Sequence, residues 1–205
     1  MRHGQSKGNA AGLLLGRADS PLTELGESQA ASIGAHLAAD AKRIGKVPPR
    51  IISSPLSRAR DTAESISRAL ASDSGGGPPV EVDDRWIELD YGELDESTLS
   101  AVPPGVWSAW RADRDWRPPG GETLVEVAER VRRACLDIAP AALAGDVVVV
   151  SHVTPIKAAV AWVLGSGIET SWRMSLSVAS ITRVTMAPSS AVLASFNDTS
   201  HLAGP

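Results

Sequence analysis

The residues best suited to chemistry are an arginine–histidine pair at the start of the chain and two similar residues far downstream. Arg2 and His3 belong to the opening "MRHGQSKGN", Arg58 follows the apolar segment "RIISS", and His152 ends the run "VVVVSH". Two guanidinium groups and two imidazoles around one point would bind a dianion. Phosphate is the obvious candidate, because arginine holds it through paired hydrogen bonds. This chemistry requires a fold that brings the four residues together.

Two apolar segments have the features of buried strands. The segment "RIISS" covers residues 50–54, and "GDVVVVSH" covers residues 145–152 with no polar alternation. A run without alternation is typical of a strand buried on both faces, as in a parallel sheet. The carboxyl ends of parallel strands meet at one edge of the sheet, where chemistry gathers. If "RHG" also follows a strand, all four candidate residues lie at that edge.

Helical patterns alternate with these strands along the chain. Residues 20–42 have apolar residues at helical spacing with Thr23 as the capping residue, and residues 55–71 form an amphipathic helix. Residues 123–139 place Cys135 on a buried helical face, and residues 154–165 form a further helix after the main strand. The order predicts an α/β fold with three layers, helix/sheet/helix, around a mostly parallel central sheet.

The remaining segments complete a single domain over residues 1–205. Residues 80–90 are expected to contain a short strand and the turn after it, and residues 180–186 and 191–196 are strand-like. The stretch "SDSGGGPP" at 72–79 has the composition of a surface connection. Residues 97–121 are predicted to be an irregular, lid-like insertion that holds three of the six tryptophans, which we expect to serve packing.

Composition excludes several classes of protein. A net charge of −4 gives no reason to expect nucleic acid or an anionic membrane as a partner. The single cysteine rules out an internal disulfide and suits a reducing compartment. No apolar run approaches the ~20 residues that span a bilayer. These features predict a cytoplasmic location.

Six segments in order make the chain similar to the histidine phosphatase superfamily, with its phosphoglycerate-mutase-like fold. They are "RHGQSKGN", "GRADSPLTELGESQA", "SSPLSRARDTAE", "ELDYGE", "PPGGET" and "VVVSHVTPIKA". The last segment most resembles the alpha-ribazole-phosphate phosphatase type. The resemblance implies a phosphomonoesterase acting on a small phosphorylated metabolite through a phosphohistidine, with no metal or other cofactor. The chain could also form a homodimer.

The resemblance implies a role for each candidate in the catalytic set. His3 would be the nucleophile, which must be neutral to attack phosphorus. Arg2, Arg58 and His152 would stabilise the transferring phosphoryl group by charge. Glu88 would be the general acid, and partial burial would help it to hold its proton.

Other assignments are weaker or leave alternatives open. Glu88 has several acidic neighbours, and its spacing to Gly92 selects it. Asn9 would give a neutral amide donor to the phosphate. Ser6 and Arg17 would contact substrate, although either could serve turn structure alone.

Two departures from the family pattern matter. Leu94, Asp95 and Glu96 stand where members commonly have Trp-Glu-Gly, so this loop is expected to differ. The family also has a hydrophobic strand directly before its "RHG", where this sequence has only Met1. We therefore expect a first strand to be missing, because an internal codon was taken as the initiator or, as a less favoured explanation, because an upstream domain is absent.

Two alternative functions stay open. Short length favours a phosphatase over cofactor-dependent, phosphoglycerate mutase-like phosphotransfer, which needs a pocket closed to water. Without its first strand the chain could also be an inactive phosphate-binding protein. Phosphate affinity without turnover would identify the second alternative.

Overall fold

The centre of the protein, seen in a computed structural model, is a three-stranded parallel sheet. The structure describes residues 1–48, 50–71, 76–188 and 190–202. The strands are β1 (Arg50–Ser53), β2 (Val80–Val82) and β3 (Val147–Val150), in the order β2-β1-β3. The predicted parallel sheet is confirmed, and the carboxyl ends of β1 and β3 lie side by side. Part of the expected connection at 72–79 falls on residues 72–75, outside the described residues.

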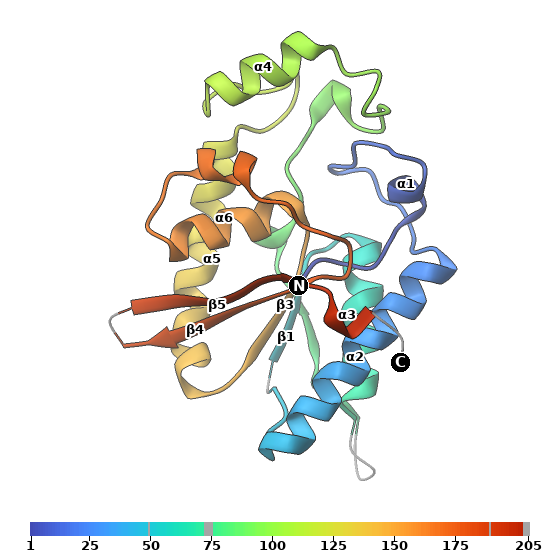
Figure 1. Ribbon diagram of the computed structural model, residues 1–205, viewed down its shortest axis with the longest axis vertical. Coiled ribbons are helices and arrows are strands. Elements are labelled where there is room, and N and C mark those ends of the chain that lie inside the picture. The colour runs from blue at the N-terminus through green and yellow to red at the C-terminus, as the bar shows by residue number, and fades with distance from the viewer. Residues whose placement is uncertain (49, 72–75, 189, 203–205) are drawn as a thin grey trace.

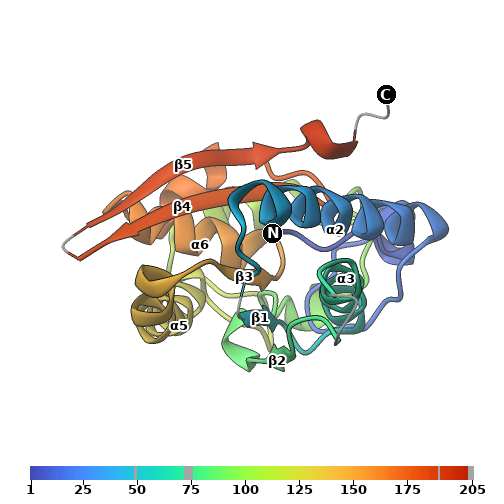
Figure 2. The ribbon, with the colours of Figure 1, turned by 90° about the horizontal axis from the view of Figure 1, so that it is seen from below.

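Helices cover both faces of this sheet, as the predicted three layers require (Figures 1 and 2). Helices α2 (Glu24–Ile44) and α3 (Ser57–Ala69) pack together on one side, and α5 (Leu124–Ala144) and α6 (Val153–Val163) pack on the other. Alternate β3 valines serve the two faces: Val148 and Val150 belong to the core under α2 and α3, while Val147 and Val149 pack on the core that contains α5. Both faces of β3 are therefore covered, as its unbroken valine run predicted.

The first residues of the chain extend along the end of β3. The Ser151 N–H donates to the Met1 carbonyl at 2.9 Å, and the His3 N–H donates to the Ser151 carbonyl at 3.1 Å. On the other side, the Arg2 N–H donates to the Ser180 carbonyl at 3.0 Å. Residues 1–3 thus take the position of a short strand, which brings His3 to the same edge as the ends of β1 and β3.

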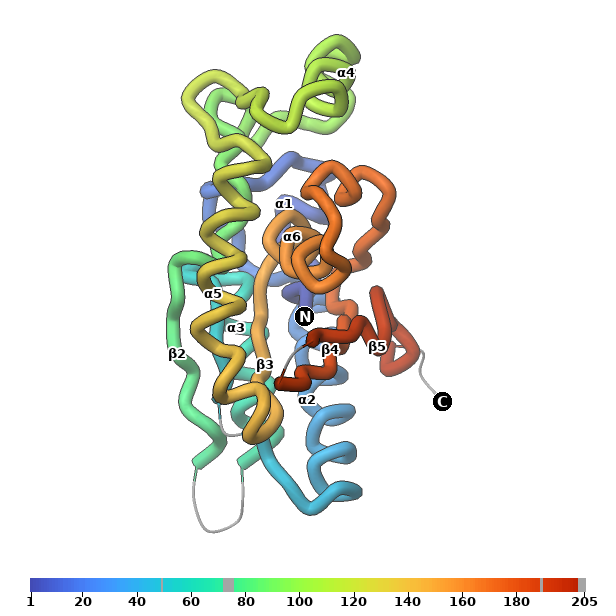
Figure 3. Tube along the Cα trace, turned by 90° about the vertical axis from the view of Figure 1, so that its left-hand side faces the viewer, coloured from blue at the N-terminus to red at the C-terminus, as the bar shows by residue number. Residues whose placement is uncertain are grey.

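A hairpin lies beyond these first residues. It is formed by β4 (Ile181–Ala187) and β5 (Ser190–Asp198), which pair antiparallel, so the two strand-like segments at 180–186 and 191–196 are confirmed. Within the described residues β4 and β3 share no ladder. An apolar cavity of about 180 Å³ separates them, with Met1, Val149 and Val184 among its lining residues. The tube view shows the N-terminus between β3 and the hairpin (Figure 3).

The segment 97–121 is less irregular than expected. It contains the helix α4 (Pro104–Ala112), which begins at a proline, a residue tolerated in the first turn. Its tryptophans drive this order: Trp110 is 2% exposed and lies against Trp107, Trp116 and Tyr91, at ring-centroid distances of 6.0, 5.2 and 5.6 Å. The prediction that the tryptophans serve packing is confirmed, and the prediction of an irregular segment is wrong at α4.

Local sequence signals predicted the start of α2 correctly but not the end of α5. Thr23 caps α2 as predicted, because its hydroxyl accepts the Gly26 N–H at 3.0 Å. Helix α5 continues to Ala144, past the expected end before Pro140. A proline removes one helical hydrogen bond, and the alanines around Pro140 favour the helix enough to extend it. None of the described helices is both long and apolar enough to cross a membrane.

Candidate active site

Three of the four residues predicted to converge are buried together at the carboxyl edge of the sheet. His3, Arg58 and His152 are 3%, 1% and 0% exposed. The His3 and His152 rings lie 5.0 Å apart, measured between centroids. Arg58 stands in the first turn of α3 directly after β1, and His152 follows β3 at the start of α6. Arg2, part-buried, joins them through the extended residues 1–3.

His3 is held with one ring nitrogen fixed and the other open. Its Nδ1 lies 2.7 Å from the Gly4 carbonyl oxygen, so Nδ1–H donates there and Nε2 keeps its lone pair. The Gly4 N–H donates to the Thr62 hydroxyl at 3.1 Å, which anchors the segment to α3. Gly4 also lies against Gly26 on α2, where a Cβ at position 4 would come 2.3 Å from the Gly26 carbonyl oxygen. The glycine of "RHG" is therefore required by this close approach.

Burial and positive neighbours keep His3 neutral. Removal from water lowers the pKa of His3 well below its usual range, and the Arg2 and Arg58 charges lower it further. Burial likewise lowers the pKa of His152, followed by the effects of His3 and the two arginines. A neutral imidazole with a free Nε2 is the form that can attack phosphorus.

The Arg58 guanidinium is fixed by two backbone carbonyls. Its Nη1 donates to the Ala18 carbonyl at 2.9 Å and its Nη2 to the Gly16 carbonyl at 3.1 Å. Burial lowers the pKa of Arg58, and the nearby Glu88 opposes that effect. Because the far side of the guanidinium is occupied, only its remaining N–H groups are available to a ligand.

Arg2 and His152 each have one hydrogen-bond partner that holds the side chain in place. Arg2 Nη1 donates to the Leu176 carbonyl at 2.6 Å, and His152 Nε2 lies 2.7 Å from the Ser54 hydroxyl. Three buried nitrogens of the cluster have no hydrogen-bond partner in the described part of the chain: Arg2 Nε, Arg58 Nε and His152 Nδ1. Buried donors are nearly always paired in proteins, so this group of orphaned nitrogens beside His3 indicates an anion site.

Glu88 lies in the same buried cluster and is 3% exposed. It follows the short 3-10 helix η1 (Asp84–Trp86). One carboxyl oxygen, Oε1, accepts the Leu89 N–H at 2.7 Å and the Thr154 N–H, in the first turn of α6, at 3.2 Å. The other oxygen makes only a 3.4 Å contact with Thr154 and is available for proton transfer. This position makes Glu88 a better placed acid than its exposed neighbour Glu93.

The three weaker candidates have structural partners of their own. Ser6 and Asn9 form a reciprocal capping box on the short helix α1 (Lys7–Ala10), in which each side chain accepts the other residue's N–H. Arg17 lies half-buried with Glu122 and Asp90, at N–O distances of 3.3 and 3.9 Å. Turn and loop structure thus accounts for the contacts of these three side chains, and their contact with substrate stays a prediction.

Asp95 organises the loop that holds Arg58, and the sequence analysis did not assign it this role. Its two carboxyl oxygens accept the N–H groups of Gly16, Arg17 and Ala18 at 2.7, 2.8 and 2.8 Å. The Gly16 and Ala18 carbonyls of the same turn then hold Arg58. The signal was the departure from Trp-Glu-Gly at 94–96, which indicated a different loop without revealing its partner.

The two buried histidines predict a loss of stability in mild acid. Their folded-state pKa lies below the unfolded value of about 6.5, so the unfolded chain binds more protons as the pH falls below that value. Each histidine then removes up to about 1.4 kcal/mol of stability per pH unit below about 6.5. Urea unfolding at pH 7.5 and pH 5.5 checks this. His3→Gln should reduce the acid-induced loss by about 1.4 kcal/mol, and an unchanged loss would contradict a neutral His3.

Comparison with known proteins identifies the family to which this chain is similar. The family model of the histidine phosphatase superfamily (branch 1) matches residues 1–199. A "bifunctional protein" of Mycobacterium tuberculosis is 36% identical over 184 residues, which are 88% of this chain and 48% of that protein. This chain therefore spans about half the length of that curated relative.

Solved structures agree with this result. A mycobacterial glucosyl-3-phosphoglycerate phosphatase, in complex with VO3, is similar with a TM-score of 0.80 and 28% identity, over 97% of both chains. A putative alpha-ribazole-5'-P phosphatase from Escherichia coli has a TM-score of 0.79 and 25% identity, over 97% of this chain and 94% of that one. In the described residues of this chain no three His, Cys, Asp or Glu side chains are grouped to hold a metal ion.

Proposed function

The chain belongs to the histidine phosphatase superfamily (branch 1), and from this premise we propose that it hydrolyses phosphate monoesters of a small metabolite. One observation carries the proposal. The orphaned nitrogens of Arg2, Arg58 and His152 lie in one buried cluster with His3, whose Nε2 is free. This arrangement offers a phosphoryl group both fixed donors and a nucleophile.

The first step transfers the phosphoryl group to His3. The Nε2 lone pair attacks phosphorus, an N–P bond forms and the ester P–O bond breaks. Glu88 gives its proton to the departing alkoxide, which leaves as an alcohol. The arginines and His152 stabilise the charge spread over the phosphoryl oxygens, so the proposed reaction is metal-independent.

The second step releases phosphate. Water attacks phosphorus in line with the N–P bond, and the Glu88 carboxylate accepts the proton that this water loses. The N–P bond breaks, inorganic phosphate leaves and His3 returns to its neutral form. Because Glu88 alternates between acid and base, the same residue serves both steps.

Helix α4 lies at one end of the molecule (Figure 1), and we propose that the substrate enters there. We place the segment 97–121 there as a lid, because its aromatic cluster packs on Tyr91, three residues after Glu88. The substrate class is a phosphate monoester of a small metabolite, which agrees with the names of the two phosphatases above. Such substrates fit a cytoplasmic location.

Hydrolysis of p-nitrophenyl phosphate in excess EDTA tests the proposal. We expect turnover that EDTA does not reduce and that orthovanadate inhibits, since a five-coordinate vanadate resembles the transferring phosphoryl group. Tight phosphate binding without turnover would instead support a binding protein. Transfer of the phosphoryl group to an acceptor metabolite rather than to water would support mutase-like phosphotransfer.

A further inference from the structure

We propose that Arg130, on α5, is a positioning residue for the general acid: it holds the backbone at Arg85 and at Glu88 and thereby sets where the Glu88 carboxyl lies. The inference rests on the proposed function, in which Glu88 protonates the leaving group. Arg130 lies outside the six segments that carry the family resemblance. Its role is inferred from its contacts in the folded chain.

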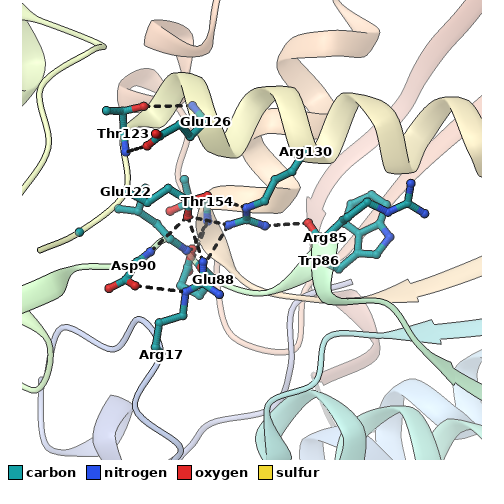
Figure 4. Close-up of polar contacts among 12 residues, drawn as sticks. Arg17, Arg85, Trp86, Glu88, Asp90, Glu122, Thr123, Glu126, Arg130 and Thr154 are labelled. Atoms are coloured by element: carbon teal, nitrogen blue, oxygen red, sulfur yellow. Dashed lines mark hydrogen bonds and ion pairs between the residues drawn. The ribbon is translucent and has the colours of Figure 1, made fainter.

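Arg130 binds two carbonyls of the segment that ends in Glu88. Its Nη1 donates to the Arg85 carbonyl at 2.7 Å and its Nη2 to the Glu88 carbonyl at 3.2 Å. Figure 4 shows its guanidinium between these carbonyls and Glu122. One planar group thus spans the turn from η1 to the acid. Lysine has no such fork and could not reproduce it.

Glu122 forms an ion pair with the same Arg130 guanidinium. It accepts Arg130 Nε at 2.8 Å and Arg130 Nη2 at 3.0 Å, in a two-point ion pair with both side chains about 15% exposed. The same carboxyl accepts the Asp90 N–H at 3.3 Å, and the Glu122 N–H donates to the Asp90 carbonyl at 2.9 Å. The segment 85–90 is therefore held at Arg85, Glu88 and Asp90 by one ion pair.

The Glu88 carboxyl itself depends on this backbone. In the described residues its hydrogen-bond partners are two backbone N–H groups, of Leu89 and Thr154, and no side chain. A shift of the segment would move the carboxyl relative to α6 and to the phosphoryl site. Misplacement of a catalytic group by about 1 Å can reduce a rate by about a hundredfold. The role of Arg130 is therefore expected to appear in proton transfer, and phosphate binding should be nearly unchanged.

The test compares Arg130→Ala and Arg130→Lys with Arg132→Ala as the matched control. Arg132 is on the same helix and pairs with Glu129 in an exposed contact, where an ion pair contributes little. For an alkyl phosphate, whose leaving group needs a proton, we expect kcat to fall at least about tenfold in both Arg130 variants. For p-nitrophenyl phosphate, whose leaving group needs little acid assistance, the rate of the nitrophenolate burst, which reports the first step alone, should change by no more than about twofold.

A double variant separates positioning from general damage. If Arg130 acts through Glu88, adding Arg130→Ala to Glu88→Gln should lower the alkyl phosphate rate by no more than about twofold further. The inference is overturned if Arg130→Ala slows the first step equally for both esters, if it slows neither, or if its effect persists in full beside Glu88→Gln. A wild-type chain without phosphatase activity would instead refute the proposed function, and this distinguishes the two failures.

Discussion

Replacement of His3 by alanine is expected to reduce hydrolysis of every phosphate ester by about a thousandfold or more. Alanine has no lone pair to attack phosphorus, and no other histidine is placed to replace it. His152 Nε2 is already engaged with the Ser54 hydroxyl at 2.7 Å. The loss should appear in kcat, while affinity for inorganic phosphate persists because Arg2 and Arg58 remain.

A matched control and a binding measurement make this result specific. His36→Ala removes a histidine that lies against Arg183 and Asp40, on α2 and away from the cluster, and should leave the rate unchanged. Calorimetric titration with phosphate shows whether the His3→Ala site still forms. Near-normal turnover in His3→Ala would refute covalent catalysis by this residue.

Glu88→Gln is expected to have an effect that depends on the ester. Glutamine keeps the shape of the side chain and can still accept the Leu89 and Thr154 N–H groups, but it has no proton to give to an alkoxide. Hydrolysis of an alkyl phosphate should fall by about a hundredfold or more. The first-turnover burst of nitrophenolate, a stable anion, from p-nitrophenyl phosphate should be affected far less, whereas steady-state turnover of this ester falls because the attack of water has lost its base.

Glu93→Gln is the matched control for this variant. Glu93 is an acidic residue of the same loop, but it is exposed, whereas Glu88 is buried. Its replacement should change neither ester's rate. Equal losses in the first-step rates of both esters in Glu88→Gln would assign Glu88 a structural role, and the acid would have to be sought among its neighbours.

The convergence of the cluster could be predicted because it follows from strand order. A valine run without alternation indicates a parallel strand, and parallel strands deliver His152 and the start of α3 to one edge. Thr23 and the buried Cys135 followed from local patterns in the same way. Such signals lie within a few residues of the feature that they predict.

The features that sequence reasoning missed depend on partners far apart in the chain. Asp95 holds a turn almost eighty residues earlier, at Gly16, and Arg130 holds the carbonyl of Arg85. Helix α4 is anchored by Trp110, which packs against Tyr91 and Trp172 from other parts of the chain. Backbone carbonyls carry no sequence signature, so contacts of this kind become visible only in the folded chain.

The phosphohistidine itself gives the most direct test of the account. In Glu88→Gln the nitrophenyl ester still phosphorylates the enzyme, whereas the attack of water lacks its base, so the intermediate should accumulate. We would mix this variant with p-nitrophenyl phosphate, quench in alkaline denaturant and locate the phosphoryl group by tandem mass spectrometry. The account predicts one phosphoryl group on the His3 imidazole. A phosphoryl group on another side chain, or none during measured turnover, would contradict it.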